Sequence, residues 1–539
     1  MTAAGFEGTD ALMELNTAVI QIKPRSGSMI RTGLFSSRLS LLLLVCLALA
    51  LRSLAWNASL VSYDPDEAVY FVMAQQWLAG HLPYVAVWDQ HPVGLPAILA
   101  AGGWLVGDVL RAGRMGASIA VGVTAWLILR FVATAAGSMA PAAIGAVLYV
   151  ICMNRLEALP TQTEVFNNLL VSAAAWLLFS AARRPWPRDM PAVAGASLLL
   201  GTALQVKYVV FPECVLLCCG YLAYLRADRL DLRAGLLRAG LMIGGGLAPT
   251  ALVCAIYWWA GDWSLFWQAN VTANLAYASD LPAFDKALTL IWDGLRSSGI
   301  LVSVTAAVLW ASFSKPGIRH ARLRVWLGLW VLANLLNICL PMKFYHHYFL
   351  ALLPPMCIAG GLTLAWVIQR LPEPRRPKPW RPRLQGLAVT ALAAAMLAIP
   401  TRAALLHAAI LHDNNAVDAP RLIAADIARL GPGDLYVYND SPILYYLTAR
   451  LPPTRYVLPL ELQNFASSSG AHGPAEVAAA IARRPRYVVT SDPPRFAFAP
   501  KIDALVNALL ATYDVAASYP NPVAGNRLRL HVAKAAGAK

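Results

Sequence analysis

The sequence is poor in charged residues. Only 14% of its 539 residues are Asp, Glu, Lys or Arg, whereas 58% are hydrophobic. This composition excludes an ordinary soluble domain, in which about a quarter of the residues are charged. The charges that are present are clumped, and they leave many apolar runs of about 20 residues, each long enough to span a bilayer as a helix.

The sequence also lacks the cysteine spacing of a metal site. It contains eight cysteines, none of them in a Cys-x-x-Cys pair, and all of them lie in apolar runs. We expect them to be small buried hydrophobic residues. No internal repeat is evident either, so a repeat architecture is not expected.

The net charge of +15 does not indicate nucleic-acid binding. The Lys and Arg residues lie in short loops between apolar runs, as the positive-inside rule expects, so the bilayer is the predicted partner and nucleic acid is not. Five basic segments mark the predicted cytoplasmic side: 23–38, 183–188, 226–238, 315–324 and 370–383.

Counting charges gives a topology. Between Arg38 and Arg183 there are five apolar segments, but both ends are predicted to be cytoplasmic, so one segment must not cross. The segment 93–110 is rich in Pro and Gly, and we assign it as an interfacial or re-entrant helix. The predicted spans number about eleven: 39–57, 115–136, 139–153, 164–182, 190–206, 208–226, 235–259, 297–313, 323–341, 349–369 and 384–402. In the alternative, 93–110 spans and a later short helix does not.

Three regions follow from this topology. Residues 1–38 form a cytoplasmic arm, and Met29-Ile30-Arg31 resembles a translation start. The first span is expected to stay uncleaved, because no small-x-small site follows it. Residues 39–402 form the transmembrane domain, with a first outer loop at 58–114. Residues 403–539 are predicted to be a small extracytoplasmic α/β domain, with an amphipathic helix at 417–430 and strands at 435–438 and 486–490.

The first outer loop opens with three acidic residues. Asp64, Asp66 and Glu67 precede a stripe at helical spacing that includes Tyr70 and is expected to lie on the membrane surface. Acidic residues beside a membrane are costly unless they have a function. The loop returns to the membrane through Trp88-Asp89-Gln90-His91-Pro92.

Other outer segments bring further polar residues to the same side. Lys207 and Lys343 depart from the positive-inside pattern, and an anionic lipid phosphate would explain them. The remaining candidates on this side are Arg155, Glu164, His346, His347 and Tyr348.

Each candidate also has a structural interpretation. Asp64 could cap a helix that begins at Pro65, and the acids after it would then be favoured by the helix dipole. Lys207 could extend to the lipid headgroups. The His346-His347 pair could be ordinary interfacial polar groups.

Taken in order, these motifs resemble those of the GT-C membrane glycosyltransferases, most closely the protein O-mannosyltransferase and lipid A aminoarabinose transferase group. The resemblance covers about residues 39–370 and rests on Asp66-Glu67, Tyr70, Ala74, Gly80, Pro83-Tyr84, His91-Pro92, Thr163-Glu164, Gly201, Lys207, His347-Tyr348 and Pro354-Pro355. It implies an all-α polytopic fold with juxtamembrane helices after the first span. It also implies transfer of a hexose or pentose, usually with inversion, from a polyprenyl-phosphate donor to an acceptor at the outer face.

The resemblance implies roles for individual residues. Asp66 matches the catalytic acid of the family and is expected to be the general base, with Glu67 in support and Glu164 as the acid of the second outer loop. Lys207, His346 and His347 are expected to stabilise charge that develops on the phosphate. The other expected substrate-binding residues are Asp64, Tyr70, Tyr84, His91, Arg155, Lys343 and Tyr348.

No cofactor is firmly expected. A divalent cation, Mg²⁺ or Mn²⁺, held by Asp64, Asp66 and Glu164 is the alternative, because Asp64-Pro65-Asp66 fits the Asp-x-Asp spacing of oligosaccharyltransferase relatives. The expected compartment is a bacterial inner membrane, with undecaprenyl phosphate as the lipid and an envelope lipid, glycan or protein as the acceptor. Competing functions are a lipid-linked sugar transporter or flippase, an O-antigen ligase or polymerase, and a non-catalytic scaffold.

Overall fold

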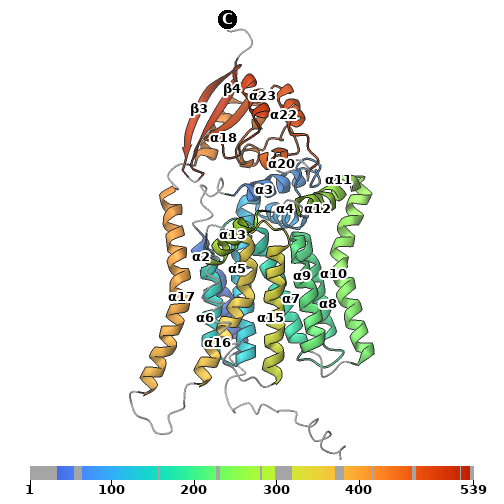
Figure 1. Ribbon diagram of the computed structural model, residues 1–539, viewed down its shortest axis with the longest axis vertical. Coiled ribbons are helices and arrows are strands. Elements are labelled where there is room, and N and C mark those ends of the chain that lie inside the picture. Colours follow the sequence, from blue (N-terminus) through green and yellow to red (C-terminus); the bar gives the residue numbers. More distant parts are fainter. Residues whose placement is uncertain are drawn as a thin grey trace, which may run out of the picture. The chain divides into compact units, whose positions relative to one another are not determined.

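The computed structural model describes residues 33–53, 64–155, 158–225, 231–278, 282–297, 318–370, 381–414, 418–463, 469–522 and 524–534 (Figure 1). The chain divides into two units, Met1–Leu43 and Leu44–Lys539. The first helix, α2 (Gly33–Arg52), runs across this division. All interactions described below lie within the second unit.

Five apolar segments in the described part are helical and long enough to cross a membrane. They are α5 (Val109–Ala136), α7 (Thr163–Ala181), α10 (Leu232–Ala260), residues Ala321–Cys339 of α15 (Ile318–Cys339), and His346–Gln369, which ends in α16 (Leu353–Arg370). Shorter apolar helices accompany them: α6 (Met139–Cys152), α8 (Met190–Val206) and α9 (Phe211–Gly220). The last apolar helix, α17 (Arg381–Asn414), continues well past the predicted end at residue 402. The chain is therefore a mostly helical, multi-pass membrane protein, while the count of eleven spans stays a prediction. Nearly all of the predicted span 297–313 lies outside the described residues.

The segment predicted not to cross forms a short helix, α4 (Gly94–Val106), which ends where Gly107 adopts a φ of 80°. A helix of this length is about 20 Å long, against an apolar core of about 30 Å. The next helix corrects a predicted boundary. Asp108 caps α5 by accepting a hydrogen bond from Arg111 N–H at 2.9 Å. As a result α5 begins at Val109 rather than at 115 and includes Arg111 and Arg114.

Small residues let the apolar helices approach one another closely. A Cβ added at Gly145 of α6 would lie 2.8 Å from the carbonyl oxygen of Cys357 on α16. One added at Gly201 of α8 would lie 2.4 Å from the carbonyl oxygen of Gly246 on α10. Such close packing is typical of helices that associate in membranes. The cysteines follow the prediction only in part, because Cys152 and Cys357 are buried whereas Cys46, Cys219 and Cys339 are exposed.

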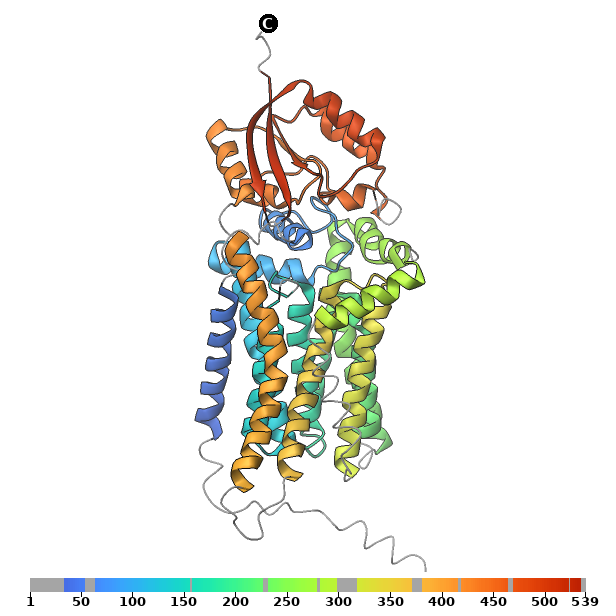
Figure 2. The ribbon, with the colours of Figure 1, turned by 60° about the vertical axis from the view of Figure 1, so that its left-hand side comes forward.

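The C-terminal segment contains a four-stranded sheet. Its order is β1 (Leu435–Val437), β2 (Tyr487–Asp492), β4 (Asn526–Ala533) and β3 (Tyr513–Asn521), and β1–β2 is the parallel pair. The sheet lies between α18 (Ala419–Leu430) and the pair α22 (Gly473–Ala482) and α23 (Pro500–Leu510) (Figure 2). The predicted helix corresponds to α18 and the two predicted strands to β1 and β2. The hairpin β3–β4 was not predicted. Two short helices, α19 (Ile443–Thr448) and α20 (Pro459–Gln463), follow β1.

Helix α3 (Pro65–Leu78) lies between the apolar helices and the C-terminal segment. Val72 and Met73 share a hydrophobic core with Ile423 of α18 and Val489 of β2. On its other side, Phe71 joins the core of the helix bundle. The predicted stripe of this helix therefore packs against protein on both sides, because the C-terminal segment covers it. Three further helices follow α10 on this side of the bundle (Figures 1 and 2): α11 (Trp263–Trp267), α12 (Ala273–Ala278) and α13 (Phe284–Ser297).

Candidate active site

A cavity of about 250 Å³ lies beside the N-terminus of α3. Its walls come from α3, the loop after it, the start of α7, the end of α8, the segment before α16, and α20 with the residues preceding it. The charged or titratable residues that line it are Asp66, Tyr70, Asp89, His91, Lys207, Tyr208, Tyr277, Tyr345, His347, Tyr348 and Glu461. The cavity thus brings together residues that are far apart in the sequence.

Asp66 is placed at the cavity by the way in which α3 begins. Asp64 is the N-cap, and it accepts hydrogen bonds from the backbone N–H of Asp66 at 2.9 Å and of Glu67 at 3.2 Å, with Pro65 as the first helical residue. Burial raises the pKa of Asp66 above its ordinary value, and the charges of His91 and Lys207 only partly offset the rise. A raised pKa brings a carboxylate closer to the range in which a general base works well.

Asp89 and His91 form a pair on the same wall. His91 Nδ1 lies 3.0 Å from Asp89 Oδ2, and the imidazole ring meets Tyr70 edge to face with ring centres 5.7 Å apart. Burial opposes the charged form of His91, but the attraction of Asp89 outweighs it and raises the pKa of His91. This pair therefore adds no net charge to the cavity when His91 is protonated.

Lys207 faces the cavity from the break after α8. Its Nζ lies 2.5 Å from Glu164 Oε1 and 4.1 Å from the ring centre of Tyr348. The side chain is only 7% exposed, so it does not extend to the headgroups. Glu164 also accepts a hydrogen bond from Thr163 Oγ1 at 2.9 Å, and it does not line the cavity. Glu164, predicted to be catalytic, instead holds the ammonium group of Lys207 in place.

The structure also corrects the predicted role of Glu67. Its carboxylate is 1% exposed and accepts hydrogen bonds from Arg114 Nε at 3.1 Å and Nη2 at 2.7 Å. The backbone N–H of Thr161 donates a third bond at 2.7 Å. Consecutive helical residues are about 100° apart around the axis, so Glu67 points away from the cavity that Asp66 lines. Glu67 thereby ties α3 to α5 and to the segment that precedes α7.

Asp64 is a capping residue that lies beside the cavity. Its second oxygen accepts a hydrogen bond from Gln162 Nε2. Burial and the charges of Asp66 and Glu67 raise the pKa of Asp64 to about 7. The capping interpretation of Asp64 is therefore correct, and its predicted contact with substrate is not supported.

Four other predicted residues do not line the cavity. The hydroxyl group of Tyr84 donates a hydrogen bond to the carbonyl oxygen of His91 at 2.8 Å and so stabilises the loop that follows α3. Lys343 lies 4.7 Å from the ring centre of Tyr277, which does line the cavity. Arg155 is buried outside the lining, and His346 is half-buried and is not a lining residue. By contrast His347 and Tyr348 are in the wall, as predicted.

Sequence reasoning missed two acidic residues of the site. Asp89 could have been found, because it stands two residues before His91 in the same motif. Glu461 had no such signal, since it lies in α20 among apolar residues. It is 3% exposed, and its Oε2 accepts a hydrogen bond from Leu458 N–H at 3.3 Å. Burial and the nearby charge of Asp89 raise the pKa of Glu461 well above its usual range.

The proposed cation ligands do not form a metal site in this arrangement. No group of three His, Cys, Asp or Glu residues in the described part of the chain could hold a metal ion. Asp64 is used as a cap and Glu164 is paired with Lys207. The set Asp64, Asp66 and Glu164 therefore does not fit a bound cation in this conformation.

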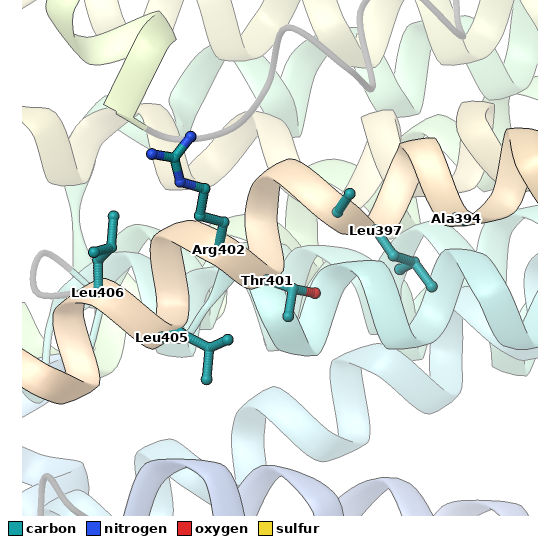
Figure 3. A pocket seen from close by; sticks show the side chains of 7 residues that line it. Ala394, Leu397, Thr401, Arg402, Leu405 and Leu406 are labelled. Atoms are coloured by element: carbon teal, nitrogen blue, oxygen red, sulfur yellow. The ribbon is translucent and has the colours of Figure 1, made fainter.

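A second hollow, on α17, has a different character. Figure 3 shows side chains that project to several sides of the helix, and the hollow is an open strip lined by Ala394, Leu397, Ala398, Thr401, Arg402, Leu405 and Leu406. It contains no acid or His to act as a base. The cavity beside α3, which is lined by acids and histidines, is therefore the candidate site.

The fold is similar to those of solved membrane glycosyltransferases. The sequence matches no protein-family model and no curated protein. The structure of ArnT from Cupriavidus metallidurans bound to undecaprenyl phosphate is 15% identical, with a TM-score of 0.59 over 92% of this chain and 99% of that one. The oligosaccharyltransferase AglB from Archaeoglobus fulgidus, in complex with an inhibitory peptide and a dolichol-phosphate, is 11% identical, with a TM-score of 0.50 over 94% and 75%. The fold implied by the sequence motifs is therefore confirmed: this chain has the fold of the GT-C membrane glycosyltransferases.

Proposed function

We propose that this protein transfers a sugar from a polyprenyl-phosphate donor to an acceptor hydroxyl at the outer face of a bacterial inner membrane. The lipid is proposed to be undecaprenyl phosphate, because the similar ArnT structure is bound to that lipid. In this orientation the N-terminus is cytoplasmic and the C-terminal segment periplasmic. The acceptor is an envelope lipid, glycan or protein.

One observation carries this proposal. A carboxylate with a raised pKa, Asp66, and a buried ammonium group, Lys207, line the same cavity. A base on one side and a cation on the other are what glycosyl transfer from a lipid phosphate requires. A transporter would not require a base and a cation fixed in the wall of one cavity.

The proposed reaction follows from these positions. Asp66 takes the proton of the acceptor hydroxyl as its oxygen attacks the anomeric carbon. The bond between that carbon and the phosphate oxygen breaks, and its electron pair leaves with the polyprenyl phosphate. Lys207 Nζ, held by Glu164, and His347 stabilise the charge that grows on the phosphate. Attack opposite the leaving group inverts the anomeric centre.

Replacing Asp66 tests this assignment. In purified full-length protein in nanodiscs, we expect Asp66→Asn to lower transfer from undecaprenyl-phosphate-linked hexoses and pentoses by on the order of 10²–10⁴-fold, the usual contribution of a general base. The matched control is Asp514→Asn, an exposed aspartate of β3, which should transfer like wild type. Wild-type rates from Asp66→Asn would refute the assignment. Movement of the intact donor across the bilayer without transfer would indicate a flippase.

A further inference from the structure

Two carboxyl groups of the cavity lie outside its ion pairs. Lys207 is paired with Glu164, and His91 with Asp89. Asp66 and Glu461 line the same cavity, and neither forms an ion pair with any residue that the structure describes. Burial raises the pKa of Glu461 well above its usual range, so its carboxyl group keeps a proton near neutral pH and can both donate and accept hydrogen bonds.

The same wall carries polar atoms without hydrogen-bond partners in the described structure. Trp88 is 1% exposed, and its indole Nε1 is buried and unpaired. Gln90 Oε1 is also buried and unpaired, and both residues line the cavity. A buried polar group without a hydrogen-bond partner is costly, so such groups in a cavity wall indicate a ligand or a water.

These groups are fixed in position by the C-terminal segment. The backbone N–H of Trp88 donates a hydrogen bond to the carbonyl oxygen of Arg455 at 2.8 Å, and the centre of the Trp88 ring lies 5.7 Å from that of the Tyr456 ring. Glu461 is held by its bond from Leu458 N–H. The wall is therefore rigid before any substrate arrives, which lowers the entropic cost of binding.

We propose that Trp88, Gln90 and Glu461 form a subsite for the hydroxyl groups of an uncharged, polyhydroxylated acceptor. The indole N–H donates to a hydroxyl oxygen, whereas the Gln90 amide oxygen and the Glu461 carboxyl accept from hydroxyl hydrogens. An acceptor with a phosphate next to its attacking hydroxyl is disfavoured by Asp66, which must be ionised to accept the proton, since unfavourable charge pairs suppress wrong partners. Calling this ligand the acceptor rests on the proposed glycosyl transfer.

Two matched probes test the subsite: octyl β-glucoside and octyl β-glucoside 6-phosphate, below their micelle concentrations. Full-length protein in nanodiscs of zwitterionic lipid is titrated with each, and the dissociation constants are measured by ligand-observed NMR. We expect wild type to bind the neutral probe about tenfold more tightly than the phosphate, a difference of about 1.4 kcal/mol. Glu461→Ala should weaken binding of the neutral probe severalfold, because it removes a carboxyl group that forms hydrogen bonds to the hydroxyl groups. Trp88→Phe should weaken binding of the neutral probe severalfold, because it removes the indole N–H.

Glu476→Ala is the matched control, since Glu476 lies in the same segment, accepts a hydrogen bond from Thr454 Oγ1 at 2.9 Å, and is not in the cavity wall. Equal binding of the two probes by wild type, or unchanged binding of the neutral probe by Glu461→Ala, would overturn the subsite. Binding of undecaprenyl phosphate is measured in parallel by native mass spectrometry. Failure of that lipid to bind, with the neutral preference intact, would count against the proposed donor and leave the subsite standing.

Discussion

Asp66 and Glu67 are consecutive residues, yet they belong to two regions with opposite properties. Glu67 lies in a closed polar network in which Arg114 and a backbone N–H satisfy its carboxylate. Nearby, Arg52 donates to the carbonyl oxygens of Met153 and Ala158 at 2.7 and 2.8 Å. Asp66 faces a cavity whose polar groups are only partly paired. The comparison shows that fully paired charges here fix the geometry, while the incompletely paired ones remain available for a substrate.

Breaking the closed network should have the largest effect on stability. Arg114→Leu leaves the Glu67 carboxylate buried without its cation, and such a loss typically costs about 3–5 kcal/mol. We expect a large fall in the thermal unfolding midpoint, measured in detergent by intrinsic fluorescence. Arg111→Leu on the same helix is the control, because the Arg111 side chain is 75% exposed and its pair with Asp108 should contribute about 0–1 kcal/mol. Equal effects of the two substitutions would contradict the comparison.

On the cavity side, removing the ammonium group of Lys207 should weaken donor binding, and it also leaves the buried Glu164 carboxylate without its cation. Lys207→Met removes the cation proposed to bind the donor phosphate, and a hydrogen bond to a charged group is worth about 1.5–3 kcal/mol. We therefore expect undecaprenyl phosphate to bind about 10- to 100-fold more weakly by native mass spectrometry. Lys501→Met, on the exposed surface of α23, should bind like wild type. Unchanged binding by Lys207→Met would remove this residue from the proposed phosphate site.

The pH dependence of transfer should report the environment of Asp66. Burial raises the pKa of Asp66, and only its ionised form can accept a proton. Transfer should therefore be lost as the pH falls through this raised value, by about tenfold per pH unit below it. The acidic limb of kcat/KM against pH should lie above the ordinary aspartate range near 4. A limb at or below that range would show that Asp66 is not held in a buried environment during catalysis.

The smallest effect is expected from the helix cap. Asp64→Ala removes the two bonds to the first turn of α3 and should cost about 1 kcal/mol of unfolding free energy. Asp418→Ala provides a matched comparison, because Asp418 caps α18 by accepting from Arg421 N–H at 3.2 Å. The two variants should show similar shifts in thermal midpoint. A loss of transfer in Asp64→Ala beyond a hundredfold, with folding unchanged, would instead make Asp64 part of the reaction.

The sequence was sufficient for the parts of the fold that depend on local patterns. Apolar length located the long apolar helices of the described residues, and the Pro and Gly content of 93–110 singled out the segment that forms the short helix α4. The Asp64-Pro65 pair predicted the start of α3. The buried face of α3 was missed because its burial depends on the C-terminal segment, which is distant in sequence and whose β3–β4 hairpin has no strong local signal.

Residues of the candidate site were predictable only where a sequence motif contained them. Asp66, His91, Lys207 and His347 were correctly brought to one place by the topology and the family resemblance. Glu67 and Glu164 were assigned to the reaction because their partners, Arg114 and Lys207, could not be paired with them from spacing alone. Glu461 could not be predicted from the sequence for the same reason, since only the folded chain brings α20 to the cavity.

The hydrogen bond from the backbone N–H of Trp88 to the carbonyl oxygen of Arg455 has a consequence for biosynthesis. It joins a loop that the ribosome makes before most of the membrane helices to a segment that it makes after α17. A nascent chain that has emerged only as far as α17 already carries Asp66 and Lys207 but lacks the wall that contains Glu461. The site is therefore completed only after the segment that follows α17 has been synthesised, so a partly made protein in the membrane does not yet have the complete cavity wall.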